Sequence, residues 1–366
     1  MNYNIYIIGS DYLNAISIYQ SLIDLKADGE IIFIGGSGRN MAGKIYPGVN
    51  MRSDAGDSDK LIELLLSFEK QAKKYLFLTH EKYHQMLWEK REMLEEYNVI
   101  FHIGHSDPGL IMDKTKFLQF VKENTSIPVP FAYSLDQIDK IQYPAFAKAK
   151  SSFMDDAKIS LKKQVITNQK ELEKYIHVAN SQGVSREDIE VQELLSTEAR
   201  HNVSISGWYE NDFHQFFQTQ KILQHPPKAG NGDVVKLMDL DPTLAGQTND
   251  LLSKLNYHGP FEAEFVKEQN GERYKLIEIN PRFWMQHGLI EQLSGHLLVA
   301  RYIGVEPLRP NLKYNHWMYT VIVPIQLAKL KIKYIPYLFR KDLYKPVSFY
   351  QASKFLVKYL LQRLKR

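Results

Sequence analysis

The first 110 residues alternate short apolar runs with longer amphipathic stretches, and this alternation limits the possible folds more than any other feature. Apolar runs predict strands at Asn4–Gly9, Ile31–Gly35, Tyr75–Leu78 and Val99–Ile103. Amphipathic stretches predict helices at Leu13–Ile23, Asp59–Lys73 and Lys82–Tyr97. Strands and helices that alternate in this way favour a sheet covered by helices. We therefore predict an alternating α/β domain over residues 1–110.

Beyond residue 110 the pattern changes to short strands with fewer helices. Pro128 and Pro130 interrupt the alternation just after a predicted helix at Lys114–Glu123. From Tyr143 onward, strands are predicted in PAFAKA, KQVIT, IEVQEL, NVSISGWY, FHQFFQT, FEAEFV and YKLIEIN. Helices are predicted at Gln169–Asn180 and Pro242–Asn256. We expect this region to be α+β, with antiparallel sheets.

The composition excludes several classes of protein. With 44% hydrophobic and 24% charged residues, the chain resembles ordinary soluble globular proteins. It has no cysteine, which excludes disulfides, thiolate metal sites, thiol nucleophiles and a built-in cysteine-dependent glutaminase. The amino terminus has no signal-like segment, and no apolar stretch is long enough to span a bilayer. We therefore expect a cytoplasmic protein.

The positive charge of the chain is concentrated at its carboxyl end. Residues 311–366 hold 12 of the 46 Lys and Arg residues and one of the 42 Asp and Glu residues, so residues 1–310 carry a net charge of −7. This distribution argues against nucleic acid as a partner. From Ser348 onward, apolar residues recur at helical spacing beside the basic residues Lys354, Lys358, Arg363, Lys365 and Arg366. Two interpretations stay open: a peripheral contact with the inner face of an anionic membrane, or a helix docked on the protein's own core or on the second subunit of a homodimer.

Two neighbouring strands carry a cluster of oxygen ligands. In FEAEFV the two-residue period of a strand places Glu262 and Glu264 on one face, and in LIEIN it does the same for Glu278 and Asn280. Asn270-Gly271 between them is a hairpin signal, so pairing would bring Glu264 to Glu278 and Asn280. Such a set suits Mg²⁺, which binds through one or two carboxylates and substrate phosphates. The alternative is a solvated hairpin edge whose acids point outward.

The run LIEINPRFW, with Glu264 on the strand before it, resembles the metal-binding end of the ATP-grasp superfamily, where a carboxylate precedes Glu-x-Asn-x-Arg. Other elements of that superfamily follow in family order, namely DKTKF with IPVP, YPAFAK ending at Lys148, and VQELL at Val191–Leu195. The resemblance covers residues 111–305. It implies an ATP-grasp domain at 111–310, with a small lobe at about 111–190 and a large lobe at about 191–310. A Rossmann-like pre-ATP-grasp domain at 1–110 and a basic extension at 311–366 would flank it.

The resemblance implies roles for the matched residues toward ATP. Lys114 and Lys148 would place their ammonium groups on the phosphates. Glu193 and Leu195 of the hinge strand would meet the adenine edge through their backbone groups, and Glu198 or His201 would reach the ribose. Two Mg²⁺ ions, or Mn²⁺ in their place, would be held by Glu264, Glu278 and Asn280.

The resemblance also implies catalytic and substrate residues. Lys148 and Arg282 would be catalytic, with the planar guanidinium of Arg282 holding an acyl phosphate or a carboxylate. The alternative for Arg282 is a structural ion pair with a neighbouring glutamate. The loop Gln224–Asp233, together with Lys221, resembles the substrate-side loop of carboxylate-amine ligases, and its alternative is a plain connection. Residues of the second substrate's pocket are expected at Ser10, Trp284 and His287.

One feature departs from the family pattern. The superfamily closes a glycine-rich lid over the phosphates, but no glycine occurs between residues 149 and 182. Donors for the phosphates would come instead from Lys150, Ser151, Ser152 and Lys158. How such a lid closes does not follow from the sequence.

These features predict an ATP-dependent carboxylate-amine ligase that works through an acyl phosphate and releases ADP and phosphate. Because the chain has no glutaminase cysteine, the amine would arrive free, as an amino acid or amino sugar, and if the tail meets a membrane the acceptor could be an envelope or polysaccharide precursor. The alternatives are an ATP-grasp phosphotransferase that phosphorylates a hydroxyl group, and a catalytically silent nucleotide-binding protein. The acid and the amine themselves cannot be named from the sequence.

Overall fold

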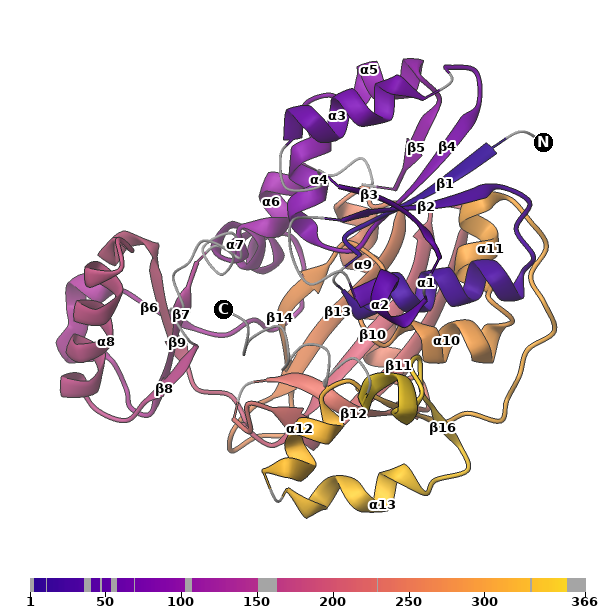
Figure 1. Cartoon of the computed structure of the whole chain (residues 1–366). Coiled ribbons are helices and arrows are strands. Elements are labelled where there is room, and N and C mark those ends of the chain that lie inside the picture. Colours follow the sequence, from indigo (N-terminus) through magenta and orange to yellow (C-terminus); the bar gives the residue numbers. More distant parts are fainter. Residues whose placement is uncertain are drawn as a thin grey trace.

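The computed structural model describes residues 3–10, 12–35, 41–46, 48–53, 58–68, 70–102, 107–150, 163–228, 230–329 and 331–353. Its strands form three sheets, with helices packed between and around them (Figure 1). Residues 151–162 of the predicted lid and residues 354–366 of the basic tail lie outside the described residues.

The amino-terminal region is a parallel five-stranded sheet, which confirms the predicted α/β fold there. Its order is β3-β2-β1-β4-β5, with β1 at Tyr3–Ile8, β2 at Glu30–Gly35, β3 at Asn50–Ser53, β4 at Lys73–Leu78 and β5 at Val99–Phe101. Its helices are α1 (Leu13–Asp24), α2 (Met41–Ile45), α3 (Ser58–Ser67), α4 (Glu81–Trp88) and α5 (Arg91–Glu96). The single helix predicted at Lys82–Tyr97 is therefore two helices, because the chain turns at residues 89–90.

Strand β1 is buried on both faces, as a strand at the centre of a parallel sheet must be. Ile5 and Ile7 join the core cluster that also contains residues of α1, whereas Tyr6 and Ile8 join the cluster beneath α3 and α4. This continuous apolar run explains why the sequence indicated a strand so clearly.

A small antiparallel sheet has the order β6-β9-β7-β8, with β6 at Ala132–Tyr133, β7 at Ala145–Ala149, β8 at Gln164–Ile166 and β9 at Ile189–Glu193. Helix α8 (Gln169–Ser181) covers it, packing Leu172 and Tyr175 onto the sheet core. It stands to one side of the rest of the molecule in Figure 1. Two helices precede it, α6 (Pro108–Met112) and α7 (Lys114–Asn124).

The large sheet has seven strands in the order β14-β13-β10-β11-β12-β15-β16. Their bounds are β10 Asn202–Glu210, β11 Phe213–His225, β12 Asn231–Met238, β13 Gly259–Lys267, β14 Tyr274–Asn280, β15 His316–Met318 and β16 Leu343–Tyr344. All pairings are antiparallel except that of β15 with β16. One face packs against α7 and α9 (Pro242–Lys254), through residues such as Phe117, Leu251 and Phe261.

The segment Gln224–Asp233, expected as a substrate-side loop or a plain connection, joins strands β11 and β12. The described residues at its two ends belong to these strands, which pair as a hairpin with Gln224 opposite Gly232 and His225 opposite Asn231. Gly230 lies directly before β12. A Cβ on Gly230 would lie 2.2 Å from the carbonyl carbon of His225, so only glycine fits there without a backbone shift.

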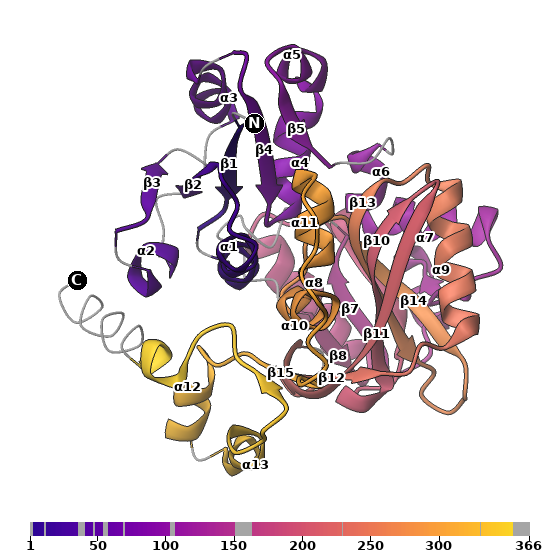
Figure 2. The same cartoon turned by 90° about the vertical axis from the view of Figure 1, so that its right-hand side faces the viewer.

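A pair of helices joins the amino-terminal sheet to the large sheet. Helices α10 (His287–Ser294) and α11 (Leu297–Ile303) lie beside α1 between the two sheets (Figure 2). One apolar core runs through this junction, since Phe77 of β4, Phe283 and Tyr302 pack their rings against one another. The amino-terminal region and the large sheet therefore share a core.

The carboxyl-terminal region adds to the large sheet, whereas the sequence suggested a separate extension. It contains β15, α12 (Val323–Ala328), the short 3-10 turn η5 (Ile332–Tyr334), α13 (Ile335–Leu338) and β16. After β16, Val347 and Ala352 are buried in the shared core. This packing matches the docked interpretation for residues 347–353. In the described part of the chain, no helix has both the length and the apolar character needed to cross a membrane.

Candidate active site

A cavity of about 590 Å³ opens where the amino-terminal sheet meets the hairpin of β13 and β14. In the sheet order β3-β2-β1-β4-β5 the chain leaves β1 in one direction and β4 in the other, and ligands bind at such a switch point, beyond the carboxyl ends of the strands. The cavity wall there consists of Tyr12, Leu13, Asn14, Thr79 and His80. The opposite wall includes Glu262, Asn280, Arg282, Met285 and Gln286.

A second cavity, of about 130 Å³, lies between the small sheet and the large sheet. Its wall includes Lys114, Lys148, Gln192, Leu195 and Glu198. Both cavities are lined by Lys221, Asn231, Glu264 and Glu278, so they meet at these four residues. A molecule in the smaller cavity would therefore reach one in the larger cavity at the carboxylates.

The strand register brings the predicted carboxylates together. Glu264 lies opposite Glu278, and Glu262 lies opposite Asn280. The Nδ2 group of Asn280 donates a hydrogen bond to Glu262 (3.1 Å). The predicted pairing of Glu264 with Glu278 is therefore confirmed, whereas Asn280 lies opposite Glu262 rather than Glu264.

Glu278 and Glu264 each form an ion pair with a lysine from another element, Glu278 with Lys114 of α7 and Glu264 with Lys221 of β11. Lys114 Nζ lies 2.9 Å from Glu278, and Lys221 Nζ lies 2.7 Å from Glu264. The Lys114 charge holds the pKa of Glu278 far below its usual value, outweighing burial. Burial opposes the charge of Lys221, but the carboxylates around it, Glu264 first, raise its pKa. The charges of Glu278 and Lys221 are thus stabilised by their ion-pair partners, whereas burial, with Glu264 nearby, raises the pKa of Glu262 to about 8.

Local structure explains where Lys114 lies. Asp113 caps α7, because its Oδ1 accepts hydrogen bonds from the backbone N–H groups of Thr115 (3.0 Å) and Lys116 (3.1 Å). The cap starts the helix at Lys114 and places this lysine in its first turn. In this sequence motif, Asp113 is therefore the N-cap of α7, and Lys114, which follows it, is the candidate site residue.

Lys148 forms an ion pair with Glu190, a residue that was not predicted from the sequence. Lys148 Nζ lies 3.2 Å from Glu190, whose other oxygen accepts a hydrogen bond from the Thr115 hydroxyl (2.8 Å). Burial lowers the pKa of Lys148, and Glu190 opposes that effect. The signal was present, because Glu190 and Gln192 alternate with the apolar residues Ile189 and Val191 along the strand.

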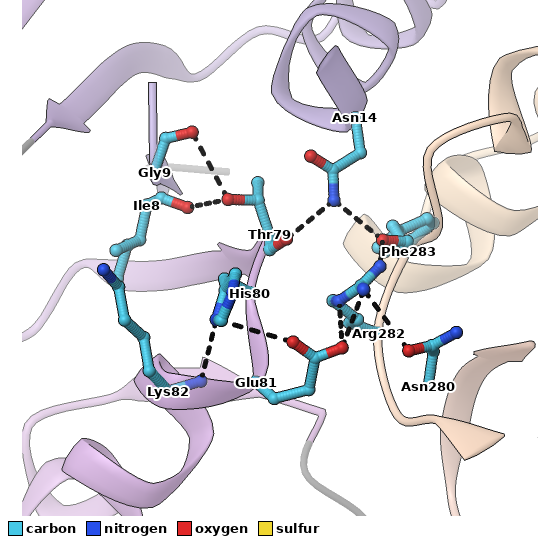
Figure 3. A network of polar contacts seen from close by, with 10 residues as sticks. All are labelled: Ile8, Gly9, Asn14, Thr79, His80, Glu81, Lys82, Asn280, Arg282 and Phe283. Atoms are coloured by element: carbon cyan, nitrogen blue, oxygen red, sulfur yellow. Dashed lines mark hydrogen bonds and ion pairs between the residues drawn. The ribbon is translucent and has the colours of Figure 1, made fainter. Parts of the chain in front are cut away.

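Arg282 makes its shortest contacts with the amino-terminal region. Its Nε donates to Glu81 Oε1 at 2.7 Å, its Nη1 to the Phe283 carbonyl at 3.3 Å and its Nη2 to Asn280 Oδ1 at 3.3 Å (Figure 3). Although burial works against its charge, Glu81 keeps a lowered pKa because Arg282 lies beside it. An ion pair with a neighbouring glutamate was the alternative for Arg282, and the structure contains such a pair, with Glu81 of α4.

Asn14 also connects the amino-terminal region to the segment that follows β14. Its Nδ2 donates to the carbonyls of Thr79 (2.8 Å) and Phe283 (2.9 Å), so one side chain of α1 bridges the end of β4 and the segment after β14 (Figure 3). Asn14 is buried. Sequence reasoning did not single it out, since a polar residue at the start of a helix is common.

Three predicted substrate residues line neither cavity. Trp284 and His287 are fully buried, and the His287 Nδ1 donates to the Trp284 carbonyl (2.7 Å) as α10 begins. Burial lowers the pKa of His287 to about 4. Ser10 is also buried, with its hydroxyl close to Gly35. Met285 and Gln286, between the two aromatic residues, line the larger cavity instead, because the chain turns as it enters the helix.

The residues expected around adenine and ribose are spread along the smaller cavity. Leu195 and Glu198 line it. The Glu193 carboxylate points elsewhere, since it accepts hydrogen bonds from Lys275 Nζ and the Phe131 backbone N–H, both at 2.6 Å. His201 bonds to the Ser196 hydroxyl (2.7 Å) and is not among the residues lining the cavity.

The oxygen atoms at the meeting point fit a hard divalent cation. The candidate ligands are two carboxylates, Glu264 and Glu278, and the amide oxygen of Asn280, which here contact Lys221, Lys114 and Arg282, respectively. Mg²⁺ is commonly bound by this number of protein ligands, with phosphates and waters completing its shell. Among the described residues, no three His, Cys, Asp or Glu side chains are grouped to hold a metal by themselves. The site therefore suits an ion that arrives with its substrate.

Comparison with solved structures identifies the fold. A carboxyaminoimidazole ribonucleotide synthase from Aspergillus clavatus, solved with ATP, is similar over 98% of this chain and 97% of its own, with 11% identity and a TM-score of 0.66. Biotin carboxylase from Campylobacter jejuni matches 82% of this chain and 70% of its own, with 16% identity and a TM-score of 0.63.

An L-amino acid ligase from Bacillus licheniformis is also similar, over 84% of this chain and 76% of its own, with 15% identity and a TM-score of 0.61. The sequence matches no protein-family model and no curated protein. These three similar structures are ATP-grasp enzymes. The chain therefore has the ATP-grasp fold, as its motifs predicted.

Proposed function

We propose that the protein is an ATP-dependent carboxylate-amine ligase. The observation that carries the proposal is the meeting of two cavities at Lys221, Asn231, Glu264 and Glu278. A nucleotide in the smaller cavity and an acid in the larger one would touch at this point. Both the L-amino acid ligase and the ribonucleotide synthases with similar structures support a ligase, by the names they carry.

The smaller cavity offers what a nucleotide triphosphate needs. Lys114 and Lys148 line it and would face the phosphates, with Leu195 beside the base and Glu198 beside the ribose. Both lysines now balance glutamates, at 2.9 and 3.2 Å. Phosphate oxygens would compete for the same ammonium groups, and compact ammonium charges suit a mobile polyanion.

Glu264, Glu278 and Asn280 would hold Mg²⁺ here. The ion would supply Lewis-acid stabilisation of the charge on the phosphate oxygens. When Lys114 and Lys221 turn toward phosphate, the freed carboxylates would be available as ligands. The two lysines and the two carboxylates thus exchange partners with little change in net charge.

The larger cavity would hold the acid and then the amine. A carboxylate oxygen of the acid attacks the γ-phosphorus of ATP, the bond to the bridging oxygen breaks, and ADP leaves. The amine nitrogen then attacks the acyl carbon, the C–O bond to phosphate breaks, and the nitrogen releases its proton to phosphate or solvent. Arg282 lines this cavity and would bind the acyl phosphate, for which its planar donors are suited.

A phosphotransferase would use the same nucleotide site, and the two reactions differ in their intermediates. An acyl phosphate is trapped by hydroxylamine as a hydroxamate, and the ligase releases inorganic phosphate only when an amine or water intercepts it. A screen of acids and amino acids for ADP release, with mass spectrometry of the products, tests the proposal. A stable phosphate ester without free phosphate would instead establish a kinase, and binding of MgATP without turnover would establish a silent protein.

A further inference from the structure

The carboxyl-terminal region concentrates the exposed apolar side chains of the molecule. Of the eleven large apolar residues exposed in the described part of the chain, six lie between residues 312 and 350. These six are Leu312, Ile332, Ile335, Phe339, Phe349 and Tyr350. Single exposed apolar residues are normal, but a group of them marks a surface with a partner.

Three of these side chains form one face, which we call the 332–339 face. Ile332, Ile335 and Phe339 follow a helical spacing along η5 and α13, and they are 71%, 41% and 79% exposed. α13 lies at the lower edge of the molecule in both views, away from α3 and α5 (Figures 1 and 2). The face therefore points outward from the body of the protein.

The opposite side of the same turns is firmly attached. Tyr334 is fully buried, and its hydroxyl donates a hydrogen bond to the Asp233 carboxylate of β12. Tyr337 and Leu338 pack against the small core that includes Val234 and Met318. The contacts of Tyr334, Tyr337 and Leu338 thus fix the orientation of these turns. The exposed apolar side chains on the other side cannot rotate into the core unless those contacts break.

Basic residues flank the face along the chain. Lys329, Lys333 and Lys341 are exposed, and Arg340 pairs with the single acid of the region, Asp342, at 2.9 Å. The charge contrast is large, because residues 311–366 hold twelve bases and one acid whereas residues 1–310 have a net charge of −7. Exposed apolar side chains in a strongly basic region suit a surface that is anionic outside and apolar beneath.

We propose that the 332–339 face docks this protein on an anionic lipid bilayer, with the apolar side chains at the headgroup level and the lysines on the headgroups. A second copy of the chain would bring the same excess of basic residues to this face, which opposes self-association. The proposal does not depend on the proposed ligase activity. It also differs from a contact made by residues 354–366, which lie further along the chain.

The full-length chain and variants are sedimented with vesicles of phosphatidylglycerol or of phosphatidylcholine. Ile332→Ser with Phe339→Ser should weaken binding to phosphatidylglycerol at least tenfold by order of magnitude, because two inserted apolar side chains are lost. Val178→Ser, which alters an exposed apolar residue of α8, is the matched control and should bind like the wild type.

A second pair tests the charge. Lys333→Glu should weaken binding about fivefold for each unit of charge removed, and high salt should do the same, whereas Lys170→Glu at the start of α8 should have little effect. Melting temperatures confirm that the variants remain folded, which is expected because the changed side chains are exposed.

The results distinguish the possible binding partners of the 332–339 face. Loss of vesicle binding in the Ile332/Phe339 variant, with an unchanged melting temperature, supports the lipid proposal. Wild-type chain that does not sediment with phosphatidylglycerol overturns it, and so does a variant that binds like the wild type, which would assign binding to residues 354–366. If the variant instead loses concentration-dependent self-association without vesicles, the face is a contact between copies and the proposal fails.

Discussion

At the scale of single residues, the candidate site depends on exchangeable ion pairs. The lysines that line the cavities are not held by backbone groups alone; Lys114 and Lys221 contact the same carboxylates that are proposed to bind Mg²⁺. Removing one carboxylate would therefore affect both the metal site and a lysine. This double use makes Glu278 the most informative position to change.

Glu278→Gln should reduce MgATP-dependent ADP release at least roughly 100-fold, a loss typical when a charge-stabilising group is removed from a site. The chain should still fold, because Glu278 lies at the cavity wall and not in an apolar core. Coupled-enzyme detection of ADP measures the rate, and circular dichroism measures the melting temperature. Glu272→Gln, in the exposed turn of the same hairpin, is the control and should keep full activity. Wild-type turnover in the Glu278 variant would rule out its proposed role.

His287 should make stability depend on pH. Burial lowers its pKa to about 4 from an ordinary value of 6.5. Between pH 6.5 and 4, His287 is therefore mostly protonated in the unfolded chain and mostly neutral in the folded chain. The stabilising contribution is complete above pH 6.5 and is lost as pH falls toward 4, at up to about 1.4 kcal/mol per pH unit. His287→Asn keeps a donor for the Trp284 carbonyl and removes this titration. Urea unfolding between pH 4 and 7 should show a shallower slope for the variant, and equal slopes would refute the assignment.

At the scale of elements, the β11–β12 hairpin is the part of the site whose shape depends most on one residue. Gly230 lines the smaller cavity, and its carbonyl lies 3.5 Å from Lys221 Nζ. A Cβ at this position would meet the backbone of His225 and Pro226. The backbone conformation at Gly230 therefore affects the position of Lys221.

Gly230→Ala should lower stability by about 1–3 kcal/mol, since the backbone of the turn must shift, and should weaken nucleotide binding as the cavity wall moves. Gly246→Ala in the middle of α9 should instead raise stability by about 0.5–1 kcal/mol, because nothing lies within 4 Å of the new Cβ. Urea midpoints and the thermal shift produced by MgADP measure both effects. Equal stabilities for the two variants would mean that the turn tolerates a side chain.

At the scale of the whole molecule, the amino-terminal sheet, the large sheet and the carboxyl-terminal region share one core. Phe77 of β4 packs on Phe283 after β14, and Val347 and Ala352 are buried in the same cluster. Polar contacts cross this junction as well, through Asn14 and the pair of Glu81 with Arg282. We expect these parts to unfold together rather than as separate domains.

Deleting residues 347–366 should lower the melting temperature and promote aggregation, because the deletion removes two buried side chains and leaves the Thr320 hydroxyl without the Val347 carbonyl. Deleting only residues 354–366 keeps Val347 and Ala352 and is the control. Differential scanning calorimetry compares the two. Identical melting temperatures would show that residues 347–353 contribute nothing to the core.

The sequence by itself determined the elements whose signals are local. The apolar run of β1 indicates a strand, the stretch Lys114–Glu123 indicates helix α7, and the period of FEAEFV and LIEIN sets Glu264 opposite Glu278, because each depends only on neighbours along the chain or across one hairpin. The motif order was enough for the ATP-grasp fold.

Only the tertiary structure decided which distant residues meet. Glu81 reaches Arg282 across 201 positions, and Asn14 reaches Phe283 across 269. Trp284 and His287, expected at the substrate, are buried instead, since the turn into α10 directs Met285 and Gln286 to the cavity. No local pattern encodes such contacts, because they follow from how two sheets pack on a shared core and not from the spacing of residues within either sheet.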